Sequence, residues 1–203
     1  MSRTSCALAV LAISALAPNA QAVTALPLDV VKFISFDCPV CRASEVMDAP
    51  IRQLTQSHGG RFVIAPLPRG VNEARERFYY VLRHWGPDAE TRVRLSLYRG
   101  AQDLNYPLND APQTLDWLQS DLTVNGVDWT RVTEQVNDPE SAAAVSRAVR
   151  LAIRAGLQVV PTYVLLQGDR VISTLDPQAV PGGELSALRE AVLNALRKNQ
   201  STH

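Results

Sequence analysis

The sequence predicts an α/β fold with an inserted all-helical subdomain, for two reasons. Segments with the apolar, β-branched pattern of strands occur only near the two ends of the chain. Between them, residues 72–156 show helical periodicity without a convincing strand. The 203 residues are enough for one sizeable core that carries an inserted subdomain. We therefore expect strand–helix–strand, then a helical block, then strand–strand–helix.

The first 22 residues have the organisation of a secretory signal peptide. Arg3 supplies a positive charge, residues 6–17 form an apolar core, and residues 20–22 read Ala-Gln-Ala, a cleavage sequence. The apolar core is too short to span a bilayer comfortably, and an uncleaved membrane anchor is the alternative. We expect removal of residues 1–22, export to the periplasm, and a mature chain that begins near Val23.

The first predicted strand leads directly into a helix. Residues 30–36, VVKFISF, suit a strand that is buried on both faces. Helical sequence begins at Pro39, because a proline in the first turn of a helix costs no hydrogen bond. The helix bends or resumes around residues 48–50 and ends at residues 58–60, which read His-Gly-Gly.

The second predicted strand, residues 61–67, completes a strand–helix–strand unit. Pro66 and Pro68 place its end near an edge or a loop, since proline cannot donate a hydrogen bond to a neighbouring strand. Residues 23–71 are therefore the first part of the α/β domain.

Residues 72–155 are predicted to form the helical insertion. Asp138, Pro139 and Glu140 are a strong start signal for its last helix, because they combine a capping side chain, a proline in the first turn and an acid near the helix N-terminus. That helix ends at Gly156. Four shorter helices are expected before it, at residues 72–85, 87–100, 112–122 and 128–136.

Residues 156–203 are predicted to be the second part of the α/β domain. Strands at 163–166 and 171–174 flank a hairpin turn that contains Gly168 and Asp169. The final helix, from Glu184 to about Lys198, has one apolar face. This face consists of Leu185, Leu188, Val192, Leu193 and Leu196.

The charge balance argues against some functions. Lys and Arg number 20, and Asp and Glu also number 20, so that the formal net charge is zero. A nucleic-acid-binding protein is expected to have a basic surplus. No run of like charges suggests a disordered tail or a membrane-surface patch.

Cys38 and Cys41 are the only cysteines of the expected mature chain, and they lie where a strand gives way to a helix. The N–H groups and the positive dipole end of a helix N-terminus stabilise a thiolate, which is the species that attacks disulfides. The second cysteine lies about one turn further along and can close a short disulfide. This context favours a redox pair in which Cys38 is the nucleophile and Cys41 the resolving cysteine.

Two other interpretations of the cysteine pair are open. A structural disulfide would stabilise little, because the loop between Cys38 and Cys41 is very short. Structural zinc needs four ligands, and His58, His84 and His203 have no spacing that completes such a site. A copper site from the two cysteines and one distant histidine is conceivable. We expect no bound cofactor apart from the redox-active disulfide itself.

The chain resembles the thioredoxin superfamily, and most closely its DsbA branch. The resemblance lies in FISFDCPVC around the cysteines, in VVPT before the third strand, and in the long, mostly helical stretch between Cys41 and Pro161. The segment RVRLSLYRGAQ and the stretch from DWTRV to RAGLQVVPT also look like the helical block of that family. The resemblance covers about residues 30–198 and implies a thioredoxin-like fold with an inserted helical subdomain.

The resemblance also implies roles for single residues. Cys38 matches the nucleophile of the family and Cys41 its resolving cysteine. Pro161 matches the cis-proline beside the active site, which in the family also keeps the dithiol from capturing metal. Val160 matches the residue whose backbone pairs with an extended substrate peptide.

The sequence departs from the family beside Cys38. Val40 stands where DsbA has a histidine that favours the thiolate, and it offers neither charge nor donor. Asp37 adds a negative charge, which disfavours a thiolate, while Pro39 begins the helix that favours one. Since the thiols of such motifs span pKa values of about 3.5 to 7, we expect Cys38 in the upper half of this range, and a milder oxidant than DsbA.

Lys32 stands six residues before Cys38, where the family has a buried acid. A lysine cannot accept a proton from Cys41 in the same way. If Lys32 is buried it stabilises a thiolate, and otherwise its side chain extends to the surface.

These observations predict an exported thiol:disulfide oxidoreductase that acts on unfolded or partly folded secreted proteins, most readily as an oxidase. A membrane redox partner of the DsbB kind would reoxidise it. The alternatives are a reductase or isomerase with a reducing partner, and a client-binding or copper-handling module of low turnover. No nucleic acid is expected as a partner, and the short segment before the first strand favours a monomer.

Overall fold

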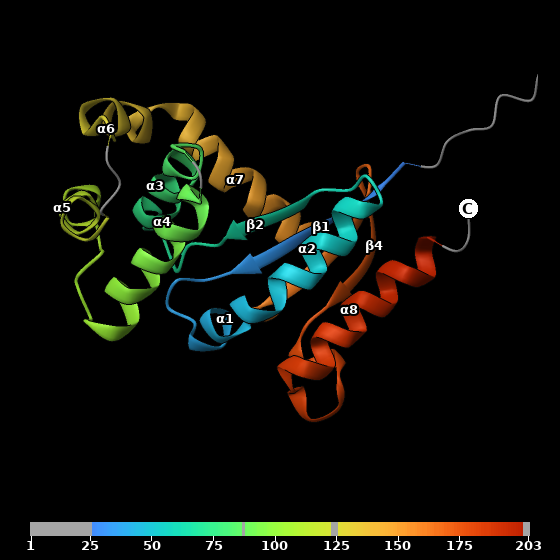
Figure 1. The fold of residues 1–203 in the computed structure, drawn as a ribbon. Helices are drawn as coiled ribbons and strands as arrows, with labels where there is room; N and C mark the ends of the chain where they lie inside the picture. Colours follow the sequence, from blue (N-terminus) through green and yellow to red (C-terminus); the bar gives the residue numbers. More distant parts are fainter. Residues whose placement is uncertain (1–25, 87, 123–125, 201–203) are drawn as a thin grey trace, which may run out of the picture.

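A four-stranded sheet forms the centre of the molecule, in the order β2–β1–β3–β4 (Figure 1). The computed structural model describes residues 26–86, 88–122 and 126–200, so the predicted signal peptide, Pro87 and His203 lie outside the described residues. The strands are β1 (Leu28–Ile34), β2 (Phe62–Pro66), β3 (Thr162–Gln167) and β4 (Arg170–Leu175).

The strand β1 pairs in parallel with β2 and antiparallel with β3, which pairs antiparallel with β4. The strand β2 lies at an edge of the sheet, where the prolines of this segment are tolerated. All the helices from α3 to α7 lie between β2 and β3 in the sequence. This order confirms the predicted fold class.

Helices cover both faces of the sheet (Figure 1). Side chains of β1 alternate between two clusters of buried apolar residues, as strand geometry requires. One cluster contains Ile34 together with residues of α2 (Asp48–Ser57) and α8 (Leu185–Gln200). The other contains Phe33 together with residues of α7 (Pro139–Arg154). The central strand is thus buried on both faces, as its sequence predicts.

The cysteines lie at the start of α1 (Pro39–Ala43), which follows β1. A 3₁₀ turn, η1 (Ser44–Met47), joins α1 to α2, and Pro50 lies in the first turn of α2. The predicted bend therefore occurs in the turn just before Asp48. It separates the short cysteine helix from the longer helix that packs on the sheet.

The inserted helices follow the predicted pattern. Asp138 caps α7 by accepting a hydrogen bond from the backbone N–H of Glu140 at 2.7 Å, and Gly156, with φ of 68°, follows the end of the helix. The other inserted helices are α3 (Ala74–Leu82), α4 (Ala89–Tyr98), α5 (Ala111–Asp121) and α6 (Trp129–Asn137).

A π-helical turn, η2 (Arg99–Asp103), extends α4 and brings the insert against the cysteine helix. The side-chain amide of Gln102 donates to the carbonyl oxygen of Phe36 at 2.7 Å. Asp103 accepts from the guanidinium of Arg42 at 2.5 Å. A side chain in place of Gly100 would come within 2.8 Å of the indole nitrogen of Trp117, so the turn needs glycine there. Such π turns often occur at functional sites.

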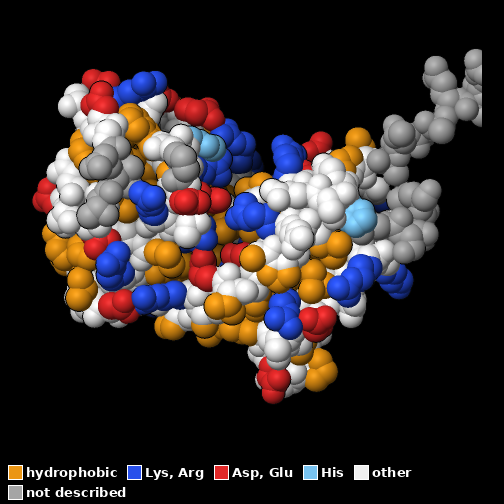
Figure 2. Space-filling view, in the orientation of Figure 1, with side chains coloured by type: hydrophobic (Ala, Val, Ile, Leu, Met, Phe, Trp, Pro, Cys, Tyr) orange, Lys and Arg blue, Asp and Glu red, His pale blue; other side chains and the backbone are white. Residues whose placement is uncertain are grey.

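The described surface has no large region of one charge on the face shown in Figure 2, where acidic and basic side chains are interspersed. This distribution agrees with the formal net charge of zero. Among the described helices, none is long and apolar enough to cross a membrane.

Candidate active site

The two cysteines occupy different environments on one turn of helix. Cys38 is the N-cap of α1 and is half-buried, while Cys41 is fully buried, and both are free thiols. The backbone N–H of Cys41 donates to the Cys38 sulfur at 3.1 Å. The more accessible sulfur is therefore the one at the helix N-terminus, as expected for a nucleophile.

Their pKa values are shifted in opposite directions. The pKa of Cys38 is lowered to about 6, chiefly by the hydrogen bond from the Cys41 thiol and then by the backbone N–H groups of Cys41 and Val40; the charge of Lys32 adds to this. The pKa of Cys41 is raised by the same hydrogen bond with Cys38 and by burial. These shifts favour a thiolate at Cys38 and a protonated thiol at Cys41. The value for Cys38 lies in the upper half of the range expected from the sequence.

The loop before β3 lies directly beside Cys38. The Val160–Pro161 peptide bond is cis, as the resemblance implied. The carbonyl oxygen of Val160 is 3.6 Å from the Cys38 sulfur. The structure therefore brings together four of the predicted site residues, Cys38, Cys41, Val160 and Pro161.

Lys32 is fully buried, so the interpretation in which it extends to the surface is wrong. Its ammonium donates to both carboxylate oxygens of Asp48, at 2.8 and 3.0 Å. The hydroxyl of Tyr163 donates to the same carboxylate at 3.2 Å. Lys32 also lies 3.9 Å from Glu45. The tertiary structure thus supplies an acidic partner that keeps the lysine inside.

Glu45 links this buried pair to the insert. It accepts two hydrogen bonds at 2.8 Å from the Nε of Arg94 on α4, and a third at 2.6 Å from the Nη2 of the same side chain. The hydroxyl of Tyr98, also on α4, is buried without a hydrogen-bond partner among the described residues. Burial, Glu45 and the two cysteines raise the pKa of this hydroxyl. A layer of charged and polar groups therefore lies beneath the cysteine turn.

Asp37 does not present the uncompensated negative charge that its sequence position suggests. Both its carboxylate oxygens accept hydrogen bonds from Arg75 on α3, at 2.7 and 2.9 Å. These bonds lower the pKa of Asp37, with burial opposing them. The guanidinium of Arg75 thus offsets the negative charge that Asp37 places beside Cys38. The effect of Asp37 on the Cys38 thiolate stays a prediction.

Pro39 and Val40, between the cysteines, are both exposed. Pro39 occupies the first turn of α1. The side chain of Val40 is 46% exposed and brings no donor to the sulfur; only its backbone N–H helps to lower the Cys38 pKa. Hydrophobic side chains gather near α1 along the lower edge of the view in Figure 2, beside the site.

Sequence reasoning missed the charged partners of the site, which are Asp48, Glu45, Arg75 and Arg94. Each is polar but carries no spacing pattern that marks it as part of a site. Asp48 and Glu45 face Lys32, Arg75 pairs with Asp37, and Arg94 pairs with Glu45. These pairings are visible only once η1, α2, α3 and α4 are packed together.

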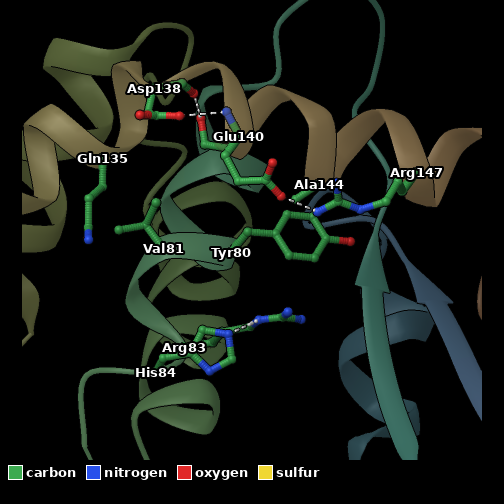
Figure 3. A pocket seen from close by; sticks show the side chains of 10 residues that line it. Tyr80, Val81, Arg83, His84, Gln135, Asp138, Glu140, Ala144 and Arg147 are labelled. Atoms are coloured by element: carbon green, nitrogen blue, oxygen red, sulfur yellow. Dashed lines mark hydrogen bonds and ion pairs between the residues drawn. The ribbon is translucent and has the colours of Figure 1, made fainter.

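Two further observations concern the rest of the described structure. Among the described residues, no group of three or more His, Cys, Asp and Glu side chains could hold a metal ion. A cavity of about 470 Å³ lies between α3, α6 and α7, where Tyr80, His84, Glu140 and Arg147 line it (Figure 3). No cysteine lines this cavity, so it is separate from the sulfurs.

Together the fold and the site define a thioredoxin-like α/β domain with a helical insert and a cysteine pair at a helix start. Several DsbA proteins are among the solved structures that are similar to it. Pseudomonas aeruginosa DsbA has a TM-score of 0.67 at 18% identity, over 87% of this chain and 86% of that one. SrgA from Salmonella enterica serovar Typhimurium has a TM-score of 0.61 at 20% identity, over 83% and 90% of the respective chains.

The oxidoreductase NmDsbA1 from N. meningitidis has a TM-score of 0.61 at 14% identity, over 91% of this chain and 90% of that one. No protein-family model matches the sequence, and no curated protein matches it. The chain therefore has the DsbA fold. At identities of 14–20% this likeness concerns the fold alone.

Proposed function

We propose that the chain is an exported thiol:disulfide oxidoreductase that oxidises cysteines of unfolded or partly folded secreted proteins. The observation that carries this proposal is the pair of opposite pKa shifts at Cys38 and Cys41, beside the Val160 carbonyl. A stable thiolate at Cys38 makes that sulfur a good leaving group and favours the reduced form of the protein. These are properties of a disulfide donor.

In the proposed reaction the protein starts with a Cys38–Cys41 disulfide. A substrate thiolate attacks the Cys38 sulfur; the bond to Cys41 breaks, and the Cys41 sulfur leaves with the electron pair and takes up a proton. A second substrate thiolate then attacks the substrate sulfur of the mixed disulfide and expels the Cys38 thiolate. The substrate loses two electrons and the protein gains them, so a membrane partner of the DsbB kind must accept them in turn.

The charged groups around the pair support this direction. The charge of the buried Lys32 helps to lower the pKa of Cys38 and so favours the Cys38 thiolate that the reaction releases. Val160 presents its carbonyl to an incoming peptide, which would pair with it as an added strand does.

A reductase or isomerase acting in the periplasm is the second candidate, and Val40 favours it. A valine between the cysteines adds no side-chain donor that would stabilise the reduced form. The reduction potential of the Cys38–Cys41 couple separates the two candidates. We expect a value well above that of thioredoxin; a potential near about −270 mV would instead assign the chain as a reductase.

Activity is tested by oxidative refolding of a reduced protein substrate and by reduction of insulin, each with Cys38→Ala as the control. Both activities should disappear in that variant. Activity that survives it would refute the catalytic proposal. The Cys41→Ala variant should trap clients as mixed disulfides on Cys38.

A further inference from the structure

A groove beside the cysteine turn contains an arginine to which the sequence assigned no role. The groove has a volume of about 280 Å³. Its walls come from the end of β1, the loop after β2 and the loop before β3. The lining residues are Ser35, Leu67, Pro68, Arg69, Leu157, Gln158, Val159 and Val160.

The groove adjoins the point where a substrate would bind. Val160 lines it, and the carbonyl oxygen of Val160 is 3.6 Å from the Cys38 sulfur. A peptide that pairs with the Val160 backbone places its cysteine at Cys38, and a residue close to that cysteine then lies over the groove. In an extended peptide, alternate side chains point toward the surface on which it lies.

Arg69 is the only charged residue among those that line this groove, and it is exposed. Within the described part of the chain, its guanidinium has no hydrogen bond or ion pair. Its charge does act on Asp37, whose pKa it helps to lower. Both carboxylate oxygens of Asp37, however, are already bonded to Arg75. The positive charge at the groove is therefore available to a ligand.

The remaining lining is mostly apolar, and a cation above apolar walls fits an acidic side chain better than a basic one. A guanidinium pairs well with a carboxylate because its planar donors match the two oxygens. A lysine brought to the same place would meet a like charge. The chemistry of this groove therefore favours an acidic side chain over a basic one.

We propose that Arg69 is a specificity-determining residue that selects polypeptide segments with an acidic side chain next to the reacting cysteine. This inference rests on the proposed function, since it concerns the peptide that reacts at Cys38. It narrows the substrate class from unfolded secreted proteins in general to cysteines in acidic segments.

The test uses the mature chain with Cys41→Ala and short peptides whose cysteine carries a chromogenic aromatic thiol in disulfide linkage. The Cys38 thiolate attacks the peptide sulfur, the disulfide breaks, and the aromatic thiolate leaves with the electron pair and is measured by its absorbance. The peptides differ only at one of the two positions that flank the cysteine, the one before it or the one after it. This position carries Glu, Gln or Lys.

At one of these positions we expect Glu to react about two- to five-fold faster than Gln, the range of an exposed ion pair, with Lys slowest. The preference should fade as salt is added. It should vanish in Arg69→Gln and reverse in Arg69→Glu. The control Arg170→Gln makes the same change of charge at the β3–β4 hairpin, remote from the groove, and should retain the preference.

Equal rates for Glu, Gln and Lys at every position, or a Glu preference that survives in Arg69→Gln, would overturn the inference while leaving the proposed function intact. If no peptide forms a mixed disulfide with Cys38, the proposed function itself fails. The two failures are therefore distinguishable in one experiment.

Discussion

Two buried carboxyl groups, one at the cysteine site and one in the helical insert, have very different surroundings. Asp48, beneath the cysteine turn, accepts hydrogen bonds from Lys32 and Tyr163. Glu76, on α3 in the insert, is fully buried, and both its oxygens are without a hydrogen-bond partner among the described residues. Burial raises the pKa of both carboxyl groups, to about 7 for Glu76, and Lys32 opposes the rise at Asp48.

The difference indicates that the site keeps its buried charges by pairing them, whereas the insert contains an acid that is best tolerated with a proton bound. Substitutions that break a pair should therefore destabilise the site. Substitutions that remove an unpaired group should stabilise the insert.

The largest effect is expected from Lys32→Met, which leaves Asp48 buried without its counter-charge. Removing one partner of a buried ion pair costs about 3–5 kcal/mol in the free energy of unfolding, measurable by urea denaturation. The pKa of Cys38 should also rise, because Lys32 helps to lower it.

The control is the double variant Lys32→Met with Asp48→Asn, in which no unpaired charge remains. Most of the lost stability should return. If the double variant is as unstable as Lys32→Met alone, lost packing rather than the unpaired carboxylate explains the defect.

Glu76→Gln should raise the free energy of unfolding at neutral pH but not at acidic pH, where Glu76 is protonated in both the folded and the unfolded protein. Burial raises the pKa of Glu76 from 4.5 to about 7, so the folded protein binds this proton more tightly than the unfolded chain does. Below pH 4.5, the pKa of Glu76 in the unfolded chain, the contribution of Glu76 to the free energy of unfolding is complete. This contribution falls as the pH rises through the pKa of about 7 in the folded protein, by about 3 kcal/mol at most. Urea denaturation of both proteins between pH 4 and 8 measures the difference, which should disappear at the acidic end.

A smaller gain is expected from Tyr98→Phe, which removes the buried hydroxyl that lacks a partner and keeps the ring packed against Phe36. Deleting an unsatisfied buried polar group is neutral or stabilises by roughly 1 kcal/mol. Thermal denaturation of the reduced protein measures it. A clear loss of stability would mean that the hydroxyl has a partner, such as an internal water.

The smallest effect is expected from Asp37→Asn on the Cys38 pKa, because Arg75 already balances this carboxylate. A titration of thiolate absorbance should show a smaller shift than Lys32→Met produces. A large fall in the pKa would restore the interpretation drawn from the sequence alone, in which Asp37 opposes the thiolate.

The sequence by itself determined most of the secondary structure and the position of the reactive pair. Asp138 caps the start of α7 and Gly156 follows its end, as predicted, because capping and stop residues act through neighbouring backbone groups. Cys38 lies at a helix start because Pro39 follows it. Such signals are local, so the residues that carry them are close together in the chain.

Only the tertiary structure decided which groups surround the sulfurs. Lys32 and Asp48 are 16 positions apart, and Asp37 and Arg75 are 38 positions apart. Arg69, in the loop after β2, lines the same groove as Val160, which is 91 positions further along the chain. Charged residues follow no periodic sequence pattern that reveals their partners. Their effect on a neighbouring pKa depends on burial and on the partner that packing brings to them. For this reason the sequence predicts that the cysteine pair lies at a helix start and that the Val160–Pro161 bond is cis, but it does not predict the charged groups around them.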